Sequence, residues 1–392
     1  MSAATRFPEP RVHAILPRII EWRRQLHGIP EVGLELPETV ARVAAELRAL
    51  GLHPRPVGYG LCVDIGERGP RVAIRADLDA LPIQERTGLA HASVHPGRMH
   101  ACGHDVHTAC LLGVAALLAE AADLPFRVRL IFQTGEESVF GARAMIAAGA
   151  LEGVTAIIGG HVFNGPDGLR PGQAGFLHGP LMGSSDRFRG AFVGSGGHGS
   201  APHLCPDPVS ALAEFIQALN SFRARRLDPA RPAVISVCSV HGGSAFNVIP
   251  ARVEFMGTAR CVHADLRALL AERIGTLGAE VARMHGLELE YQWLEGYPPV
   301  VNDARASALA AEAAREVLGA DQVVVLEQPV LAGEDFAHYL EQVPGCFWFL
   351  NTGDPDRGLT QPNHSDRFDV DESRIWAMTA VHLAAAERLA GL

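Results

Sequence analysis

The order of strand-like and helix-like segments constrains the fold of this 392-residue chain more than any other feature. Short apolar runs typical of buried strands occur at residues 71–76, 126–134 and 156–160. Helical patterns rich in small and apolar residues lie between them, at about residues 106–122 and 142–150. Strands that alternate with helices of this length form βαβ units. We therefore predict a mainly parallel sheet covered by helices.

A different pattern follows from about residue 185. The predicted elements take the order β-α-β-β-α-β, which is typical of a ferredoxin-like α+β sandwich. They are residues 188–193, 208–223, 234–240, 252–260, 264–285 and 287–294. Beyond residue 299 the α/β pattern resumes and ends in a helix over about residues 371–389. We predict a discontinuous α/β domain of residues 1–184 and 297–392, with residues 185–296 inserted as a smaller domain.

Charge and composition exclude several classes of partner. Lys and Arg total 34 against 44 Asp and Glu, a net charge of −10, so no basic surface for nucleic acid or anionic lipid is expected. The seven cysteines are odd in number and form no CxxC pair, which argues against a disulfide framework. The most apolar stretch, residues 108–122, is too short to span a bilayer, and the N-terminal residues lack the apolar core of a signal peptide. We expect a cytoplasmic protein.

The densest chemistry lies in residues 99–107, with the sequence MHACGHDVH. Three imidazoles, a thiol and a carboxylate precede a predicted helix, and thiolate and imidazole are good ligands for zinc and related divalent ions. The glycine between Cys102 and His104 lets both side chains turn toward one ion. In the alternative interpretation the histidines cap the helix and Cys102 is a small buried apolar residue.

Further candidate ligands follow predicted strands. Glu136 and Glu137 come after residues 126–134, and ligands collect at the carboxyl ends of parallel strands. One of these carboxylates can bind a metal while its neighbour acts as a general base, although an exposed acidic turn is the alternative. Asp79, His161 and His364 occupy similar positions after other predicted strands.

One motif is misleading. Residues 194–199, GSGGHG, satisfy the dinucleotide-binding pattern G-x-G-x-x-G, but Pro202 and Pro206 exclude the helix that this pattern requires. A nucleophilic Cys102 with His104 or His107 as its base is a further alternative, although it gives no role to the Glu-Glu pair.

Taken together, these motifs resemble the M20 metallopeptidase family, in its amidohydrolase branch of hippurate hydrolases, N-acyl-amino-acid amidohydrolases and auxin-conjugate hydrolases. The resemblance covers nearly the whole chain. It includes RRQLHGIPEVGLELPET, IRADLDALPI, MHACGHDVHTACLLGVA, FQTGEES, GGHGSAPH, FNVIP, GTAR, GEDFA and NHSDRFD. The segment most specific to the branch is MHACGHDVHT, with a cysteine where other branches place a bridging aspartate.

The resemblance implies a catalytic domain with two divalent metal ions, which such mixed ligands allow to be Mn, Zn, Ni or Co. The implied ligands are Cys102, His104, Glu137, His161 and His364. It further implies that the Cys102 thiolate bridges the ions, that Glu136 is the general base and proton shuttle, and that Asp79 orients a ligand.

From the inserted domain, the resemblance implies a lid and dimerisation role, with His198 stabilising the oxyanion in the neighbouring subunit of a homodimer. Asn247 and Arg260 are implied to hold the substrate carboxylate, which an arginine binds through two parallel hydrogen bonds. The inserted domain departs from the family pattern at two positions that bear on substrate preference. Ser195 stands where relatives commonly have Lys, and His241 precedes a Gly-Gly pair.

The implied activity is hydrolysis of the amide bond of an N-acyl amino acid, hippurate-like or N-acetylated, to a carboxylic acid and a free amino acid. Two alternatives stay open. One is a dipeptidase or aminoacylase of different specificity with the same site, and the other is a catalytically silent binding protein of the same fold.

Overall fold

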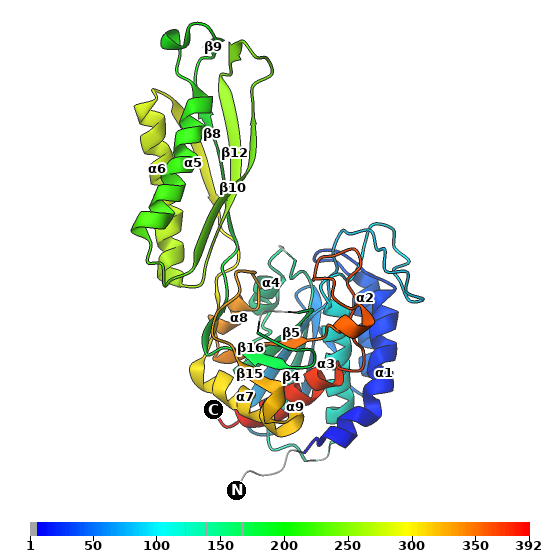
Figure 1. The fold of residues 1–392 in the computed structure, drawn as a ribbon. Helices are drawn as coiled ribbons and strands as arrows, with labels where there is room; N and C mark the ends of the chain where they lie inside the picture. Colours follow the sequence, from blue (N-terminus) through cyan, green and yellow to red (C-terminus); the bar gives the residue numbers. More distant parts are fainter. Residues whose placement is uncertain (1–5, 122, 138, 166–167) are drawn as a thin grey trace. The chain divides into compact units, whose positions relative to one another are not determined.

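The computed structural model describes residues 6–121, 123–137, 139–165 and 168–392, and the chain forms two compact units (Figure 1). Unit 1 comprises Met1–Leu181, Val301–Gln328 and Asp335–Leu392. Unit 2 comprises Met182–Val300 and the short segment Pro329–Glu334. That segment lies in unit 2 because the Gly183 N–H donates to the carbonyls of Val330 and Ala332.

Unit 1 is built on an eight-stranded sheet. The strands, in spatial order, are β1 (Arg55–Val57), β2 (Gly60–Ile65), β4 (Arg127–Gln133), β3 (Arg71–Asp77), β5 (Val154–Phe163), β16 (Gly345–Asn351), β6 (Ala174–Phe176) and β15 (Val323–Val325). The four central strands β4, β3, β5 and β16 are mutually parallel, while β2 pairs with β4 in the antiparallel sense. The predicted fold class, a mainly parallel sheet with helices, is confirmed.

The helices of unit 1 pack around this sheet. They are α1 (Glu9–His27), α2 (Pro37–Ala49), α3 (His104–Ala119), α4 (Gly141–Ala147), α7 (Ala304–Leu318), α8 (Ala337–Leu340) and α9 (Trp376–Leu389). The small and apolar residues of α3 are buried on every side, between β3, α1 and α9. Helix α9 begins at Trp376 and not near residue 371, because the Asp371 carboxylate accepts the Ser373 N–H and pairs with Arg374, which closes a turn there.

Unit 2 is an antiparallel sheet covered by two helices. The strands, in spatial order, are β10 (Ala233–Gly242), β12 (Arg252–Cys261), β8 (Asp186–Val193) and β13 (Glu288–Leu294), and the helices are α5 (Pro208–Arg226) and α6 (Ala264–Met284). Phe188, Phe192, Phe215 and Phe255 form the centre of its core. The short strands β9 (Gly197–His198) and β11 (Val248–Ile249) form a separate antiparallel pair at one end of this unit (Figure 1).

Two further strands, β7 (Gly179–Met182) and β14 (Val300–Asn302), pair with each other. Among the described residues, no helix has the length and apolar character needed to cross a membrane.

Candidate metal centre

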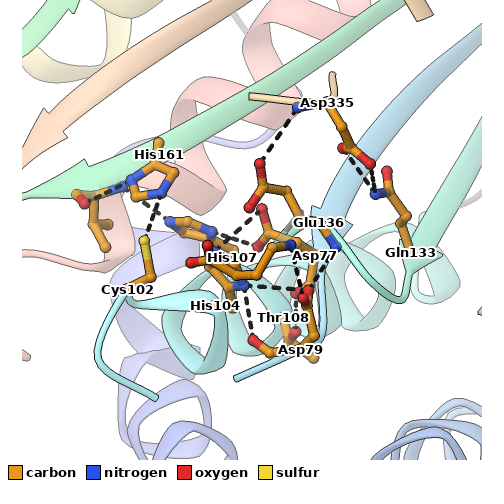
Figure 2. A network of polar contacts seen from close by, with 12 residues as sticks. Asp77, Asp79, Cys102, His104, His107, Thr108, Gln133, Glu136, His161 and Asp335 are labelled. Carbon is orange, nitrogen blue, oxygen red and sulfur yellow. Dashed lines mark hydrogen bonds and ion pairs between the residues drawn. The ribbon is translucent and has the colours of Figure 1, made fainter. Parts of the chain in front are cut away.

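The polar side chains singled out from the sequence gather at the carboxyl ends of the central strands (Figure 2). Asp79 follows β3, Glu136 follows β4, and His161 lies near the end of β5. The three strands are parallel, so their carboxyl ends lie at one edge of the sheet. Helix α3 begins at the same edge with His104.

The turn before α3 brings Cys102 and His104 together. Gly103 takes a left-handed conformation, with φ +86°, and a Cβ at this position would lie 2.3 Å from Val162 Cγ2. A residue other than glycine would therefore be both strained and in collision. The glycine allows the Cys102 thiol and the His104 ring to enter one group with His161, whose ligand atoms all lie within 4.8 Å of one another.

The two imidazoles of this group each leave one nitrogen directed to the site. His161 Nδ1 donates to the Val162 carbonyl at 2.8 Å, and its Nε2 lies 3.4 Å from Cys102 Sγ. His104 Nδ1 donates to the Asp79 carbonyl at 2.8 Å, and its buried Nε2 has no hydrogen-bond partner in the part of the chain that the structure describes. A buried nitrogen in this state is a candidate ligand atom, because the hydrogen bond on the opposite nitrogen fixes the tautomer.

The loop after β4 presents two carboxylates, and Asp79 holds its backbone. The two oxygens of Asp79 accept the N–H groups of Glu136 and Glu137, each at 2.9 Å. Asp79 therefore fixes both acidic residues, and through its carbonyl it also orients His104. Asp79 thus contacts His104 and Glu137, two of the candidate ligands, as well as Glu136.

His364 reaches the same place from a distant loop. Its Nε2 lies 3.2 Å from Glu137 Oε1, and Cys102, Glu137 and His364 form a second group of close ligand atoms. His364 has φ +69°, an uncommon conformation for a residue with a side chain. Its backbone N–H donates to the Ala101 carbonyl at 2.7 Å, and the Asn363 amide donates to the carbonyls of Cys102 and Val162. These hydrogen bonds hold the backbone of His364 in its strained conformation.

The other two histidines of residues 99–107 are not placed as ligands. His107 Nδ1 donates to Asp77 Oδ1 at 2.6 Å, and its Nε2 accepts the Val162 N–H at 2.9 Å, so both nitrogens are used. His100 is fully buried beside α1, and burial lowers its pKa to about 3. It is consequently neutral, and it belongs to none of the candidate ligand groups among the described residues.

The charges around the site fit a bound cation. Burial disfavours the charged form of His104, but Asp77 and Asp79 outweigh it and hold its pKa well above the usual 6.5. The surroundings thus stabilise positive charge at this position. Burial, together with the nearby Glu137, raises the pKa of the Cys102 thiol to about 12. A metal ion would displace this proton on binding, whereas a cysteine nucleophile needs a lowered pKa.

The donor set also fits two ions better than one. Cys102 belongs to the group with His104 and His161 and to the group with Glu137 and His364. A thiol, two or three imidazoles and a carboxylate are ligands typical of zinc and neighbouring divalent metals. Glu136, which is 6% exposed, lies beside them in a group with His104 and Glu137.

The candidate residues of unit 2 fall into two places. His198 lies on β9 opposite Val248, and the Gly199 N–H donates to the Asn247 carbonyl at 2.8 Å, so His198 and Asn247 are neighbours. Arg260 lies near the far end of β12, which starts just after β11, and donates to the Leu331 carbonyl at 3.1 Å. The intervening strand is roughly 25 Å long at about 3.3 Å per residue.

The family model for "Peptidase family M20/M25/M40" matches residues 73–388, which include every residue of the metal centre. The chain belongs to the M20 peptidase family. The family predicted from the motifs is thereby confirmed.

Other comparisons show which M20 enzymes are similar. The chain is 40% identical to the N-acetyl-L-cysteine deacetylase of Bacillus subtilis, covering 95% of this chain and 88% of that one. It is 36% identical to the IAA-amino acid hydrolase ILR1-like 4 of Arabidopsis thaliana, over 93% and 84% of the two chains. The crystal structure of the Bacillus subtilis YXEP protein, described as a dinuclear metal binding peptidase from the M20 family, superposes with a TM-score of 0.82. That protein is 36% identical to this chain, and the match covers 96% of this chain and 98% of YXEP. This M20 chain is an enzyme, a metal-dependent hydrolase of amide bonds.

Several residues of the M20 site had no role in the sequence prediction. They are Arg75, Asp77, Gln133, Asp335 and Asn363. All five lie in motifs quoted for the resemblance, in IRADLDALPI, FQTGEES, GEDFA and NHSDRFD, but no function was assigned to them. Gln133 ends β4 one residue before the Thr-Gly-Glu-Glu turn.

Proposed function

We propose that this M20 enzyme hydrolyses the amide bond of N-acyl amino acids, of the hippurate or N-acetyl type, and releases a carboxylic acid and a free amino acid. The observation that carries the proposal is the convergence of four candidate ligands on a fifth, Cys102, with Glu136 beside them. The named relatives support this substrate class, because one is a deacetylase of N-acetyl-L-cysteine and another is an IAA-amino acid hydrolase.

In this proposal Cys102, His104, Glu137, His161 and His364 would hold two divalent ions, Mn, Zn, Ni or Co. When bound, such ions polarise the acyl carbonyl and lower the pKa of a water molecule. Glu136 accepts the proton of the attacking water on its carboxylate and delivers it to the nitrogen of the leaving amine. Asp79 keeps Glu136 and Glu137 in place through its two hydrogen bonds to their backbone.

His198, Asn247 and Arg260 are proposed to contact the substrate, with His198 stabilising the oxyanion and the other two binding the carboxylate. His198 and Asn247 are neighbours, whereas Arg260 lies at the other end of β12. A single chain therefore cannot bring Asn247 and Arg260 to one carboxylate. We propose that unit 2 forms a homodimer and that a second copy supplies His198 and Asn247.

The compartment is also part of the proposal. All seven cysteines are unpaired, and several are buried. This usage is typical of proteins in a reducing compartment, so we propose a cytoplasmic location.

The proposed activity is tested by a substrate panel on metal-loaded protein. Hippurate, N-acetyl amino acids, indole-acetyl amino acids and dipeptides are offered, and release of the free amino acid is measured. We expect turnover of N-acyl amino acids, its loss on chelation, and its return with Mn, Zn, Ni or Co. Turnover of dipeptides alone would identify the dipeptidase alternative, and bound metal without any turnover would identify a silent binding protein.

The contribution of a second copy is tested by mixing two inactive variants, His198→Ala and Glu136→Gln. In a mixed dimer, one of the two sites has both residues intact. Random exchange of subunits at equal concentrations should therefore restore about one quarter of the native activity, because half of the dimers are mixed. The unmixed variants are the controls. An inactive mixture in which copurification of differently tagged subunits shows mixed dimers would place His198 in its own subunit's site.

A further inference from the structure

Asp335 belongs to a buried polar cluster beside the site, and Figure 2 shows its contacts with Gln133 and Glu136. Its side chain is inaccessible to solvent. Oδ1 accepts from Arg75 Nη2 at 2.8 Å and from Gln133 Nε2 at 2.9 Å. Oδ2 accepts from Gln133 Nε2 and from the Ala142 N–H, both at 2.8 Å. Both oxygens of the carboxylate are thus held by N–H donors.

The donors are themselves fixed. Arg75 Nη1 donates to Asp77 Oδ2 at 2.6 Å, and its Nε donates to Gln133 Oε1 at 2.9 Å. The Tyr339 hydroxyl donates to the same Gln133 oxygen at 3.0 Å. Arg75 is fully buried on β3, and Gln133 is the last residue of β4. Asp335 is therefore anchored to two central strands of the sheet.

The cluster reaches the proposed base at two points. The Asp335 backbone N–H lies 3.3 Å from Glu136 Oε1 and donates to it. The Asp335 carboxylate binds the Ala142 N–H, where the loop that carries Glu136 and Glu137 enters α4. The Gly141 N–H closes the same loop on the Gly135 carbonyl at 2.9 Å. Asp335 thus holds both an oxygen of the base and the end of the loop that carries it.

We propose that Asp335 is the positioning residue of the general base, and that its buried carboxylate fixes the backbone N–H that orients the Glu136 side chain. This inference rests on the proposed role of Glu136. A glutamate has three side-chain torsions, and a catalytic group acts efficiently only when it is held within about 0.5 Å and 10–20° of its working geometry. The hydrogen bond from Asp335 restricts those torsions before substrate binds.

The test is Asp335→Asn. The side-chain amide places an NH₂ group against an N–H donor in either orientation, so one anchoring contact is lost and the Asp335 backbone shifts. We expect kcat to fall about 10–100-fold, because a small displacement of a catalytic group has effects of this size. KM should change less than about twofold, and metal content should stay at the native value, because Asp335 contacts none of the five candidate ligands among the described residues. An unchanged kcat, or a loss confined to KM, would overturn the inference.

A double-mutant cycle separates positioning from general structural damage. In Glu136→Asp the shorter side chain no longer reaches the Asp335 N–H. Adding Asp335→Asn to this background should reduce the remaining kcat less than about twofold, because the two residues act as one unit. An equal reduction in both backgrounds would show that Asp335 does not act through Glu136. If the native enzyme hydrolyses no substrate of the panel, the proposed function fails. If Glu136→Gln retains turnover, the proposed base fails, and if only Asp335→Asn retains it, the positioning role alone fails.

Two further variants complete the design. Asp371→Asn is the matched control, because Asp371 is also a buried carboxylate bound by arginines, Arg357 and Arg374, and it should leave kcat unchanged. Should Asp335→Asn not fold by circular dichroism, Gln133→Met replaces it. This variant keeps every charge but removes the Gln133 donors, and we expect kcat to fall about fivefold. A native kcat in Gln133→Met would then overturn the inference.

Discussion

Replacing Glu136 by glutamine should reduce kcat by about three orders of magnitude and leave the metal content unchanged, because proton transfer by a positioned base contributes about 10²–10⁴-fold. The amide has nearly the shape of the carboxylate but cannot accept a proton. Its backbone contact to Asp79 would be retained. The measurement is kcat on the best substrate of the panel, together with metal per chain by mass spectrometry.

Glu137→Gln is the matched control, since Glu136 and Glu137 are adjacent and both donate a backbone N–H to the Asp79 carboxylate. In this variant we expect a loss of both metal and activity, because Glu137 lies among the candidate ligands, whereas Glu136 is proposed as the base. Near-native turnover of Glu136→Gln would remove Glu136 from the mechanism, and a loss of metal in that variant would make it a ligand instead.

The second large effect is expected at Cys102. Cys102→Ala should lose metal and at least about 100-fold in activity, because the ligand common to both groups is removed. Cys102→Asp should retain metal and an activity within about 100-fold of the native enzyme, because a carboxylate can bridge two ions. Metal per chain and kcat are measured for both variants.

These two substitutions also distinguish a metal ligand from a nucleophile. If the Cys102 sulfur attacked the substrate, the alanine and aspartate variants would be equally inactive while retaining metal. The pKa of about 12 already disfavours a thiolate in the metal-free protein. Cys110→Ser is the control, since Cys110 is buried in α3, the helix that follows Cys102, and its thiol donates to the Ile375 carbonyl, a contact that serine can also make.

Much of the fold follows from local patterns. The central strands and the elements of unit 2 have strong apolar periodicity, and their order agrees with the prediction. The antiparallel strands β1 and β2 were not predicted, because β1 has only three residues and contains Pro56, and because Gly58, Gly60 and Gly66 lie at or beside the ends of β2. The start of α9 was misplaced, because the turn at Asp371 depends on pairing with Arg357 and Arg374.

The candidate site, too, was only partly predictable from local sequence. His104 and His107 both lie in the first turn of α3, three residues apart and on the same side of the helix. Local sequence cannot distinguish them. Asp77 from β3 and the Val162 N–H from β5 occupy both nitrogens of His107 and leave His104 Nε2 for a ligand.

The sequence alone therefore determined the class of chemistry, since it supplies the thiol, imidazole and carboxylate groups and the strand order that carries them to one edge of a sheet. The tertiary structure decided that His104 Nε2 faces the site and that the Asp335 carboxylate is buried beside it. Asp335 acquires its role from Arg75, 260 residues away, and from Glu136, 199 residues away. The physical reason is that a buried polar group must find its hydrogen-bond partners, and here folding brings those partners from distant segments.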